Sequence, residues 1–166
     1  MALKQTVLES QLEGVTLDWS VASELPRIVR AHRYWIAKRG GRAMPARRDI
    51  VPTEIRDILP FVQLYDLREG GAAYRVRLLG TEVACAFEKD PTGSECDRTS
   101  NHPVVIRMLA VLGEVARRRK PVIARADRSA IDKLSYAPIE SVFLPLSDNG
   151  ADVDVVFATT IVRRLV

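Results

Sequence analysis

The sequence contains few of the side chains from which enzymes build reactive sites. Its 166 residues include two cysteines and two histidines. Cys85 and Cys96 do not form a Cys-x-x-Cys pair, so their spacing indicates neither a disulfide framework nor a zinc site. Because His32 and His102 are the only histidines, the commonest general base is scarce. We therefore expect a protein that is not an enzyme and that holds no metal or cofactor.

Long apolar runs are missing as well. No stretch approaches the ~20 apolar residues that span a bilayer, and the start of the chain lacks the apolar core of a signal peptide. We therefore expect a cytoplasmic protein without a membrane contact. The residues that are present, 47% hydrophobic and 28% charged, are typical of a folded protein, and the length suits one domain.

Aromatic residues make up only 6% of the chain, and its formal charge is +4. Together these two values bear on whether the chain binds nucleic acid. The cations cluster at 42–48, at 117–120 and at Arg163 with Arg164. A nucleic-acid-binding domain usually combines a larger basic face with aromatic rings for stacking. A nucleic-acid-binding regulator that acts through these basic patches is therefore an alternative that we rank below a protein-binding role.

Apolar residues at helical spacing predict two long helices. The first covers 21–39, with Ser23 as its expected cap, and Gly40-Gly41 permits a left-handed stop after it. The second covers 104–120, and we expect the side chain of His102 to cap its start. Both helices are amphipathic, so each should cover part of a sheet.

Alternating apolar and polar residues predict five strands. A short helix over 52–59 precedes the first strand, and the Asn-Gly turn at 147–151 indicates a final hairpin. The second long helix has to cross the sheet between the second and third strands, so we expect an α+β fold: a five-stranded antiparallel sheet with helices on one face. The strands are expected at 61–67, 73–79, 122–126, 139–146 and 153–162.

A sheet covered on one face should enclose a small interior beneath the second long helix. The residues expected to line it are apolar, which suits a small apolar ligand. A packed core without a ligand is the alternative, and both stay open at this point. The expected lining residues are Val76, Leu78, Phe87, Met108, Leu112, Val142, Leu144, Val155 and Phe157.

Four segments carry a resemblance to a known family. They are 34–50, with the pattern Trp…Arg-Gly-Gly-Arg…Pro-x-Arg-Arg-Asp, then 58–60, then 77–81 with Leu-Gly-Thr, and 143–147. Together they resemble a bacterial, mainly alphaproteobacterial, family of PAS-like proteins once classed as domains of unknown function. The resemblance implies a PAS fold with the five strands in the order 2-1-5-4-3, and a non-enzymatic role in sensing or protein interaction.

Some PAS domains hold cofactors, which defines the alternatives. Haem-binding members place an axial histidine on the helix that follows His102. A sensor based on haem or another cofactor is therefore the alternative function. For His102 itself we prefer the capping role. Flavin photosensors carry a reactive cysteine in Asn-Cys-Arg-Phe, which the Val-Ala-Cys-Ala-Phe around Cys85 does not match. Redox sensing through Cys85 or Cys96 is a further alternative.

The most distinctive polar feature is Arg47-Arg48-Asp49 with the nearby Arg42. Two guanidinium groups beside a carboxylate are able to hold an anion or an acidic group of a partner. The alternative, which we favour, is structural: Asp49 caps the following helix, and the arginines pair with acids such as Glu54.

The first long helix also suggests a binding surface. We divide the chain into an N-terminal helical extension, 1–58, and a PAS-like domain, 59–166, which form one structural unit. Because PAS-like domains commonly pair through such an extension, the helix predicts self-association or a protein partner, and packing on the sheet of its own chain is the equal alternative. The surface residues would be Leu25, Ile28, His32 and Trp35.

Overall fold

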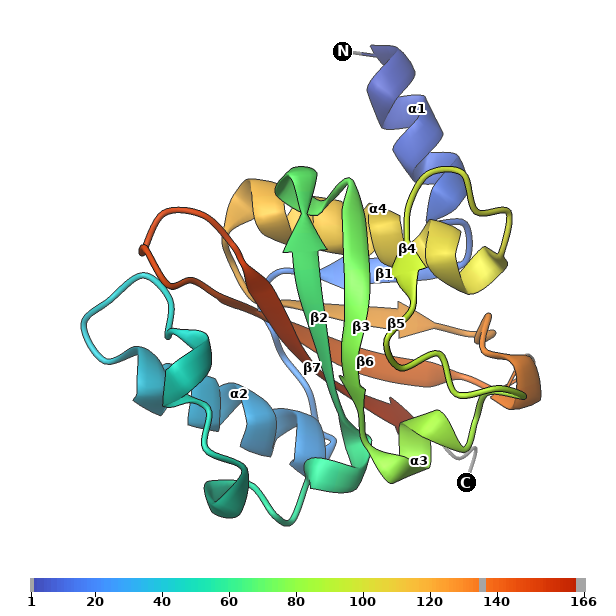
Figure 1. Cartoon of the computed structure of the whole chain (residues 1–166). Helices are drawn as coiled ribbons and strands as arrows, with labels where there is room; N and C mark the ends of the chain where they lie inside the picture. The colour runs from blue at the N-terminus through green and yellow to red at the C-terminus, as the bar shows by residue number, and fades with distance from the viewer. Residues whose placement is uncertain (1, 135–136, 164–166) are drawn as a thin grey trace.

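The computed structural model describes residues 2–134 and 137–163, which are built around one sheet (Figure 1). The described residues form seven strands in the order β1-β5-β6-β7-β2-β3-β4, and every neighbouring pair is antiparallel. The strands are β1 (Val15–Asp18), β2 (Val62–Arg68), β3 (Ala73–Leu79), β4 (Glu95–Cys96), β5 (Val122–Ala126), β6 (Ile139–Leu146) and β7 (Val155–Val162).

The prediction of a five-stranded sheet was wrong, because the sheet of the described residues has seven strands and its full order therefore differs from 2-1-5-4-3. The five expected strands are β2, β3, β5, β6 and β7, and among themselves they do follow the expected order, as β3-β2-β7-β6-β5. β1 pairs with β5, and β4 pairs with β3, so each edge of the sheet carries a strand that the sequence pattern did not indicate. The physical reason is length: β1 has four residues and β4 has two, which are too few to show an alternating pattern. The strands expected at 122–126 and 139–146 were confirmed as β5 and β6.

Helices occupy the segments before β2 and on either side of β4. The capping role of His102 was confirmed, since its Nδ1 accepts a hydrogen bond from the backbone N–H of Val104 at 3.3 Å. The α-helices of the described residues are α1 (Ala2–Gln11), α2 (Pro26–Arg39), α3 (Thr81–Ala84) and α4 (Pro103–Arg118).

The short helix expected over 52–59 is absent from the described structure. Two 3-10 turns, Pro52–Glu54 and Leu59–Phe61, take its place. A segment this short has too few hydrogen bonds to offset the cost of starting an α-helix. The turns pack Ile55 and Ile58 into the core, where both are 1% exposed.

The two long helices lie on opposite faces of the sheet, so the expectation of helices on one face was wrong. On β6, Ser141 and Phe143 line a cavity beneath α4. Because side chains alternate along a strand, Val142 and Leu144 point to the other face, which α2 covers. In Figure 1, α4 passes behind β2 and β3 near the top of the view, and α2 lies at the lower left. β6 is therefore buried on both sides.

The turn between β2 and β3 braces α4 through two glycines. Gly71 has a φ of +92°, and a Cβ atom placed on it would lie 3.1 Å from the Cα of Gly113 and 3.2 Å from the carbonyl oxygen of Leu112. Glycine is therefore required at 71 for two reasons, its left-handed backbone and the close approach of the helix.

A network of charges fastens the N-terminal arm (residues 2–25) to the sheet. Arg125 on β5 donates to Asp18 at 3.2 Å, to the buried Glu140 at 3.0 Å, and to the carbonyl of Ala22. Ser23, the expected cap of the first helix, instead donates its hydroxyl to Glu140, because α2 begins only at residue 26. This guanidinium therefore joins the arm to β5 and β6, in addition to the backbone pairing of β1 with β5.

The Gly71→Ala variant tests how much the close contact between Gly71 and α4 contributes to the free energy of unfolding. We expect it to lower the free energy of unfolding by about 1–3 kcal/mol more than Gly93→Ala does. Gly93 is a matched control, because its φ is +89° and nothing lies within 4 Å of the added Cβ. Chemical denaturation of both variants measures the difference, and equal losses would mean that α4 does not press on the turn.

The Asp18 carboxylate should make stability depend on pH in the acid range. Hydrogen bonds from Ser20 and, after them, from Arg125 lower the pKa of Asp18 from 3.8 to about 2. A lowered pKa means that Asp18 stabilises the fold above its unfolded pKa, and that this contribution is lost as the pH falls from about 4 to about 2.

The test compares the wild type with Asp18→Asn between pH 2 and pH 6. We expect the variant to be the less stable protein at pH 6, and the two unfolding free energies to converge near pH 2. Ser20→Ala should give a smaller loss over the same range, because it removes only part of what lowers the pKa. A difference that does not change with pH would contradict the role of the ionised carboxylate.

Candidate functional site

A small cavity lies between α4 and the sheet, and we call it the α4 cavity. Its volume is about 80 Å³. The walls come from α3 and the turn after it, from α4, from the loop after β5, and from the five strands β1, β2, β5, β6 and β7, so residues far apart in the chain meet there. The lining residues are Val15, Gln63, Tyr65, Val83, Phe87, Val104, Arg107, Met108, Val111, Ala124, Ala126, Ser129, Ala130, Ile131, Ile139, Ser141, Phe143 and Thr160.

The sheet side of the α4 cavity, which we call its floor, carries two hydrogen-bonded pairs of polar side chains. Ser141 on β6 and Thr160 on β7 lie opposite each other, and their hydroxyl oxygens are 2.7 Å apart. Tyr65 donates its hydroxyl to Oε1 of Gln63 at 2.9 Å, and both residues belong to β2. All four side chains are buried. Because each has a partner, an apolar group can lie on the floor without leaving one of them unpaired.

The floor is uncharged. Burial raises the pKa of Tyr65 far above its usual value, so its hydroxyl keeps the proton. Tyr74 meets Tyr65 edge to face at 5.6 Å, and burial raises its pKa in the same way. Beyond it, burial also raises the pKa of the Cys96 thiol. A raised pKa disfavours the reactive thiolate, which argues against redox sensing at Cys96.

Arg107 stands at the mouth of the α4 cavity. It also lines a pocket on the outer surface, of about 540 Å³, which we call the outer pocket. Its guanidinium donates to the carbonyl oxygens of Arg128 at 2.7 Å and of Glu13 at 3.4 Å. The side chain therefore separates the interior from solvent and connects α4 to the N-terminal arm.

Only some of the expected lining residues belong to the α4 cavity. Met108 and Phe87 line it. Val76 and Leu112 are buried in the core next to it without lining it. The remaining expected residues belong to the opposite face of the sheet, so grouping them with Met108 was wrong. They are Leu78, Val142, Leu144, Val155 and Phe157.

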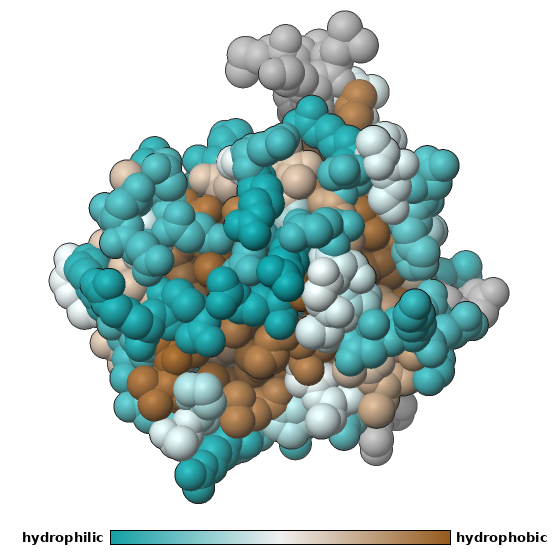
Figure 2. All heavy atoms as spheres, in the orientation of Figure 1, coloured by the Kyte–Doolittle hydropathy of each residue, from teal (hydrophilic) through white to brown (hydrophobic). Residues whose placement is uncertain are grey.

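The opposite face is covered by α2 over β6 and β7, and it is more open over β2 and β3. Leu78 is 38% exposed there, and Arg77 pairs with Asp66 at 2.6 Å. Figure 2 shows a hydrophilic band across this side of the molecule, with apolar side chains gathered below it. Leu78 is therefore a surface residue and not part of an interior.

The sequence pattern did not indicate several residues that line the α4 cavity, because they are polar. Gln63, Tyr65, Ser141 and Thr160 lie within largely apolar strands, where a polar residue usually indicates the solvent-exposed side. The one available signal was that Ser141 lies two residues before Phe143 and so shares its face. Arg107 was missed because it interrupts an apolar stripe at the start of α4.

The haem alternative does not fit the arrangement of His102. One ring nitrogen accepts the capping hydrogen bond from Val104, and the other lies 3.6 Å from a carboxylate oxygen of Asp132. The histidine is at the surface and does not line the α4 cavity, whose 80 Å³ is far below the size of a haem pocket. Neither the position of the ligand nor the space suits haem.

The loop that carries Arg42, Arg47 and Arg48, which we call the arginine loop, is held together by Asp49. The carboxylate accepts from the backbone N–H of Ala46 at 2.7 Å and pairs with Arg42 at 2.8 Å. It thus caps its own 3-10 turn, Arg47–Asp49, and not the helix that was expected after it. Glu54 pairs with Lys38 and not with the loop arginines. Arg48 is exposed, and Arg47 donates only to the carbonyl of Ile50.

The helix expected to form a dimer surface packs mainly on its own chain. Ile28 is 0% exposed and Trp35 is 2% exposed, and Trp35 Nε1 donates to the carbonyl of Pro145 at 2.8 Å. Neither is available to a partner in this conformation. Leu25 and His32 are half-buried. Burial lowers the pKa of His32, which favours its neutral form.

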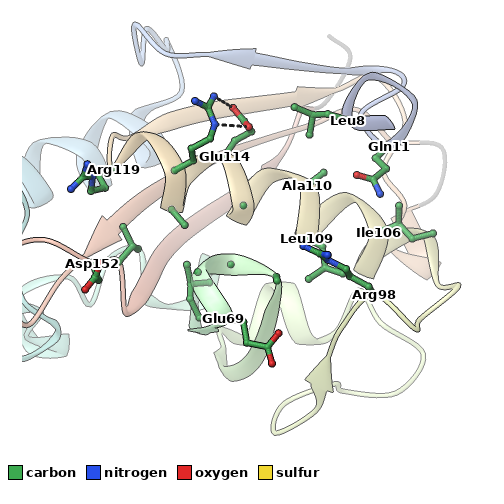
Figure 3. Close-up of a pocket in the computed structure, with 18 of the residues that line it drawn as sticks. Leu8, Gln11, Glu69, Arg98, Ile106, Leu109, Ala110, Glu114, Arg119 and Asp152 are labelled. Atoms are coloured by element: carbon green, nitrogen blue, oxygen red, sulfur yellow. Dashed lines mark hydrogen bonds and ion pairs between the residues drawn. The ribbon is translucent and has the colours of Figure 1, made fainter. Parts of the chain in front are cut away.

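A wide groove of about 1220 Å³ runs along the outer side of α4 (Figure 3). Leu8 and Gln11 from α1 face Ile106 and Leu109 from α4 across it. Both acidic and basic side chains line the groove, and Glu114 is already paired with two arginines of its own helix. Its mixed charges favour no ligand of one sign.

The described residues contain no candidate metal site and no candidate membrane-spanning helix. In 2–134 and 137–163, no three histidine, cysteine, aspartate or glutamate side chains come together in a way that could hold a metal ion. No helix in the same ranges combines the length and the apolar character needed to cross a membrane.

Comparison with known proteins agrees with the architecture. A family model described as a PAS domain matches residues 24–159, from just before α2 to near the end of β7. No curated protein and no solved structure matched the chain. PAS domains are sensory and interaction modules. The match covers most of the sequence, including both long helices and all residues lining the α4 cavity except Val15 and Thr160, so the chain belongs to the PAS domain family.

Proposed function

We propose that this PAS domain is a non-enzymatic sensor that takes the apolar part of a small molecule into the α4 cavity. The observation that carries the proposal is the floor of the cavity, where four buried polar side chains satisfy one another beneath apolar walls. Empty apolar space inside a core forfeits contacts that a ligand would supply. Arg107, at the mouth of the cavity, also donates a hydrogen bond to the backbone of the N-terminal arm, and this contact provides a route for a signal.

The size of the α4 cavity limits the ligand. A drug-sized pocket holds about 300–1,000 Å³, whereas this cavity holds about 80 Å³. Since a water molecule occupies about 30 Å³ of liquid, the space suits two or three groups of that size. We therefore propose a small ligand, or a larger one of which only a short apolar end enters.

Ala124→Leu should fill the α4 cavity. Ala124 lies on β5 at the cavity wall and is 8% exposed, and leucine adds three carbon atoms. We expect the variant to fold with a stability within about 1 kcal/mol of the wild type, because the added atoms enter existing space. In an NMR titration with pentan-1-ol, the Met108 methyl signal should shift saturably in the wild type and not in this variant.

Ala37→Leu is the matched control, because Ala37 is exposed on α2, on the other face of the sheet. It should leave the titration unchanged. A loss of about 1–3 kcal/mol in Ala124→Leu, as in an overpacked core, would show that the space is not there. A shift that survives in Ala124→Leu would show that the alcohol binds elsewhere.

A second candidate function is the binding of an acidic protein segment by α2 and the loop after it. The basic segment (residues 24–57) has nine lysines and arginines against four acids, an excess of five, which exceeds the charge of the whole chain. Three of the cations are paired: Arg30 with Asp57, Lys38 with Glu54, and Arg42 with Asp49. Four others are exposed and have no carboxylate partner among residues 2–134 and 137–163, namely Arg27, Arg33, Arg48 and Arg56.

A protein partner suits this surface better than a nucleic acid does. Ile36 is 43% exposed on α2, one turn from Arg33, and offers an apolar contact next to the charge. Phe61 and Trp35 lie beneath Arg27 and Arg39, at 4.4 and 5.5 Å, so these rings are not free to stack on bases.

Charge reversal tests this surface. Arg33→Glu should weaken the binding of a glutamate-rich peptide at least fivefold, and added salt should weaken the wild-type complex. Lys89→Glu, an exposed cation outside the basic segment, is the control and should have a much smaller effect. Fluorescence anisotropy measures both. Tighter binding of single-stranded DNA than of the peptide, with the same dependence on Arg33, would assign the surface to nucleic acid instead.

A further inference from the structure

We infer that the ligand of the α4 cavity is a short-chain carboxylic acid, held by its carboxylate on Arg107 and by its hydrocarbon chain inside. This inference rests on the proposed function, since it assigns the chemistry of the same site. Arg107 is the one charged side chain among the described residues that line the cavity. It stands where the interior meets the outer pocket, so a ligand with one charged end would leave that end at the arginine.

The guanidinium of Arg107 is incompletely used. Its two hydrogen bonds go to backbone carbonyls, and the bond to Glu13, at 3.4 Å, is long. No carboxylate of the described residues lies within 4.0 Å of it. Guanidinium has five N–H donors in a planar fork that matches a carboxylate. A carboxylate would thus bind more strongly than the carbonyls that occupy the group now.

The charge around Arg107 does not select an anion by itself. Glu13 and Asp127 line the outer pocket together with Arg107 and Arg128, so acids and bases balance there. Selectivity must therefore come from direct, two-pronged contact with the guanidinium. That requirement favours a planar carboxylate over a chloride ion or a distant acidic surface.

The positions of the lining residues on α4 set the direction of the chain. Val104 lies three and four residues before Arg107 and Met108, and these two lie four and three residues before Val111, so the four residues form one stripe facing the sheet. A hydrocarbon chain that starts at Arg107 would run along Met108 and Val111 towards the hydroxyls of the floor. With room for two or three groups inside and one or two at the mouth, acids of about four to six carbons fit.

The uncharged floor supports the same orientation of the ligand, with its hydrocarbon end inside the cavity. Ser141 and Thr160 bond to each other, and Tyr65 keeps its proton. A carboxylate pushed onto the floor would have to break one of these pairs, whereas a methyl end would not. The ligand therefore enters with its hydrocarbon end first.

The experiment compares two ligands that differ only in the charged end. Binding of pentanoate and of pentan-1-ol is followed by NMR titration of the wild type, Arg107→Gln and Arg128→Gln. We expect the wild type to bind pentanoate at least tenfold more tightly than the alcohol, and Arg107→Gln to lose that preference while its affinity for the alcohol is unchanged. Arg128→Gln is the matched control, because its backbone carbonyl, which Arg107 contacts, remains.

The outcomes separate this inference from the proposed function. Equal binding of acid and alcohol by the wild type would overturn the carboxylate assignment and leave the cavity as the binding site. No binding of either one, in the wild type as in Ala124→Leu, would overturn both. Should Arg107→Gln fail to fold, Arg107→Lys keeps the charge without the planar fork. A preference for pentanoate reduced at least threefold in that variant supports the assignment, and an unchanged preference contradicts two-pronged contact.

Discussion

The pairing of β2 with β7 holds the two halves of the sheet together. Val62 lies opposite Thr159 and Asp66 opposite Val155, although almost a hundred residues separate the partners in the chain. This one register places Gln63 and Tyr65 beneath α4 and Leu64 beside Phe157 on the other face. A slip of one residue would exchange the faces and bring apolar side chains to the floor of the cavity. Cavity and core therefore depend on the same hydrogen bonds.

Most of the regular elements could be predicted because each has a local signal. The apolar stripe of α4, its cap at His102 and its basic end were all visible in the sequence. β5 and β6 were visible as short apolar runs between turn residues. β1 and β4 had no such signal, since a strand of two to four residues gains its stability from a neighbour and not from its own pattern.

The side of the sheet on which each residue lies was harder to predict. From Val142 to Leu146, β6 is apolar at every position, because α2 covers one face and α4 the other. A run that is buried on both sides gives no alternation by which to assign faces. The expected lining therefore combined Met108 with residues of the opposite face. The pairing of Ser141 with Thr160 depends on the strand register, which a single sequence does not encode locally.

The contact between Gly71 and Gly113 has a mechanical consequence for α4. Backbone lies against backbone there, so the C-terminal half of the helix has almost no freedom to shift. The N-terminal half is attached differently, through the contact of the His102 ring with Asp132 and the hydrogen bond from Arg107 to the carbonyl oxygen of Arg128, and both of these contacts can be exchanged for water or another partner. The C-terminal end of α4 is thus held rigidly, and its N-terminal end is held by contacts that can be exchanged. Small movements at the N-terminal end would tilt the whole helix about its contact with Gly71.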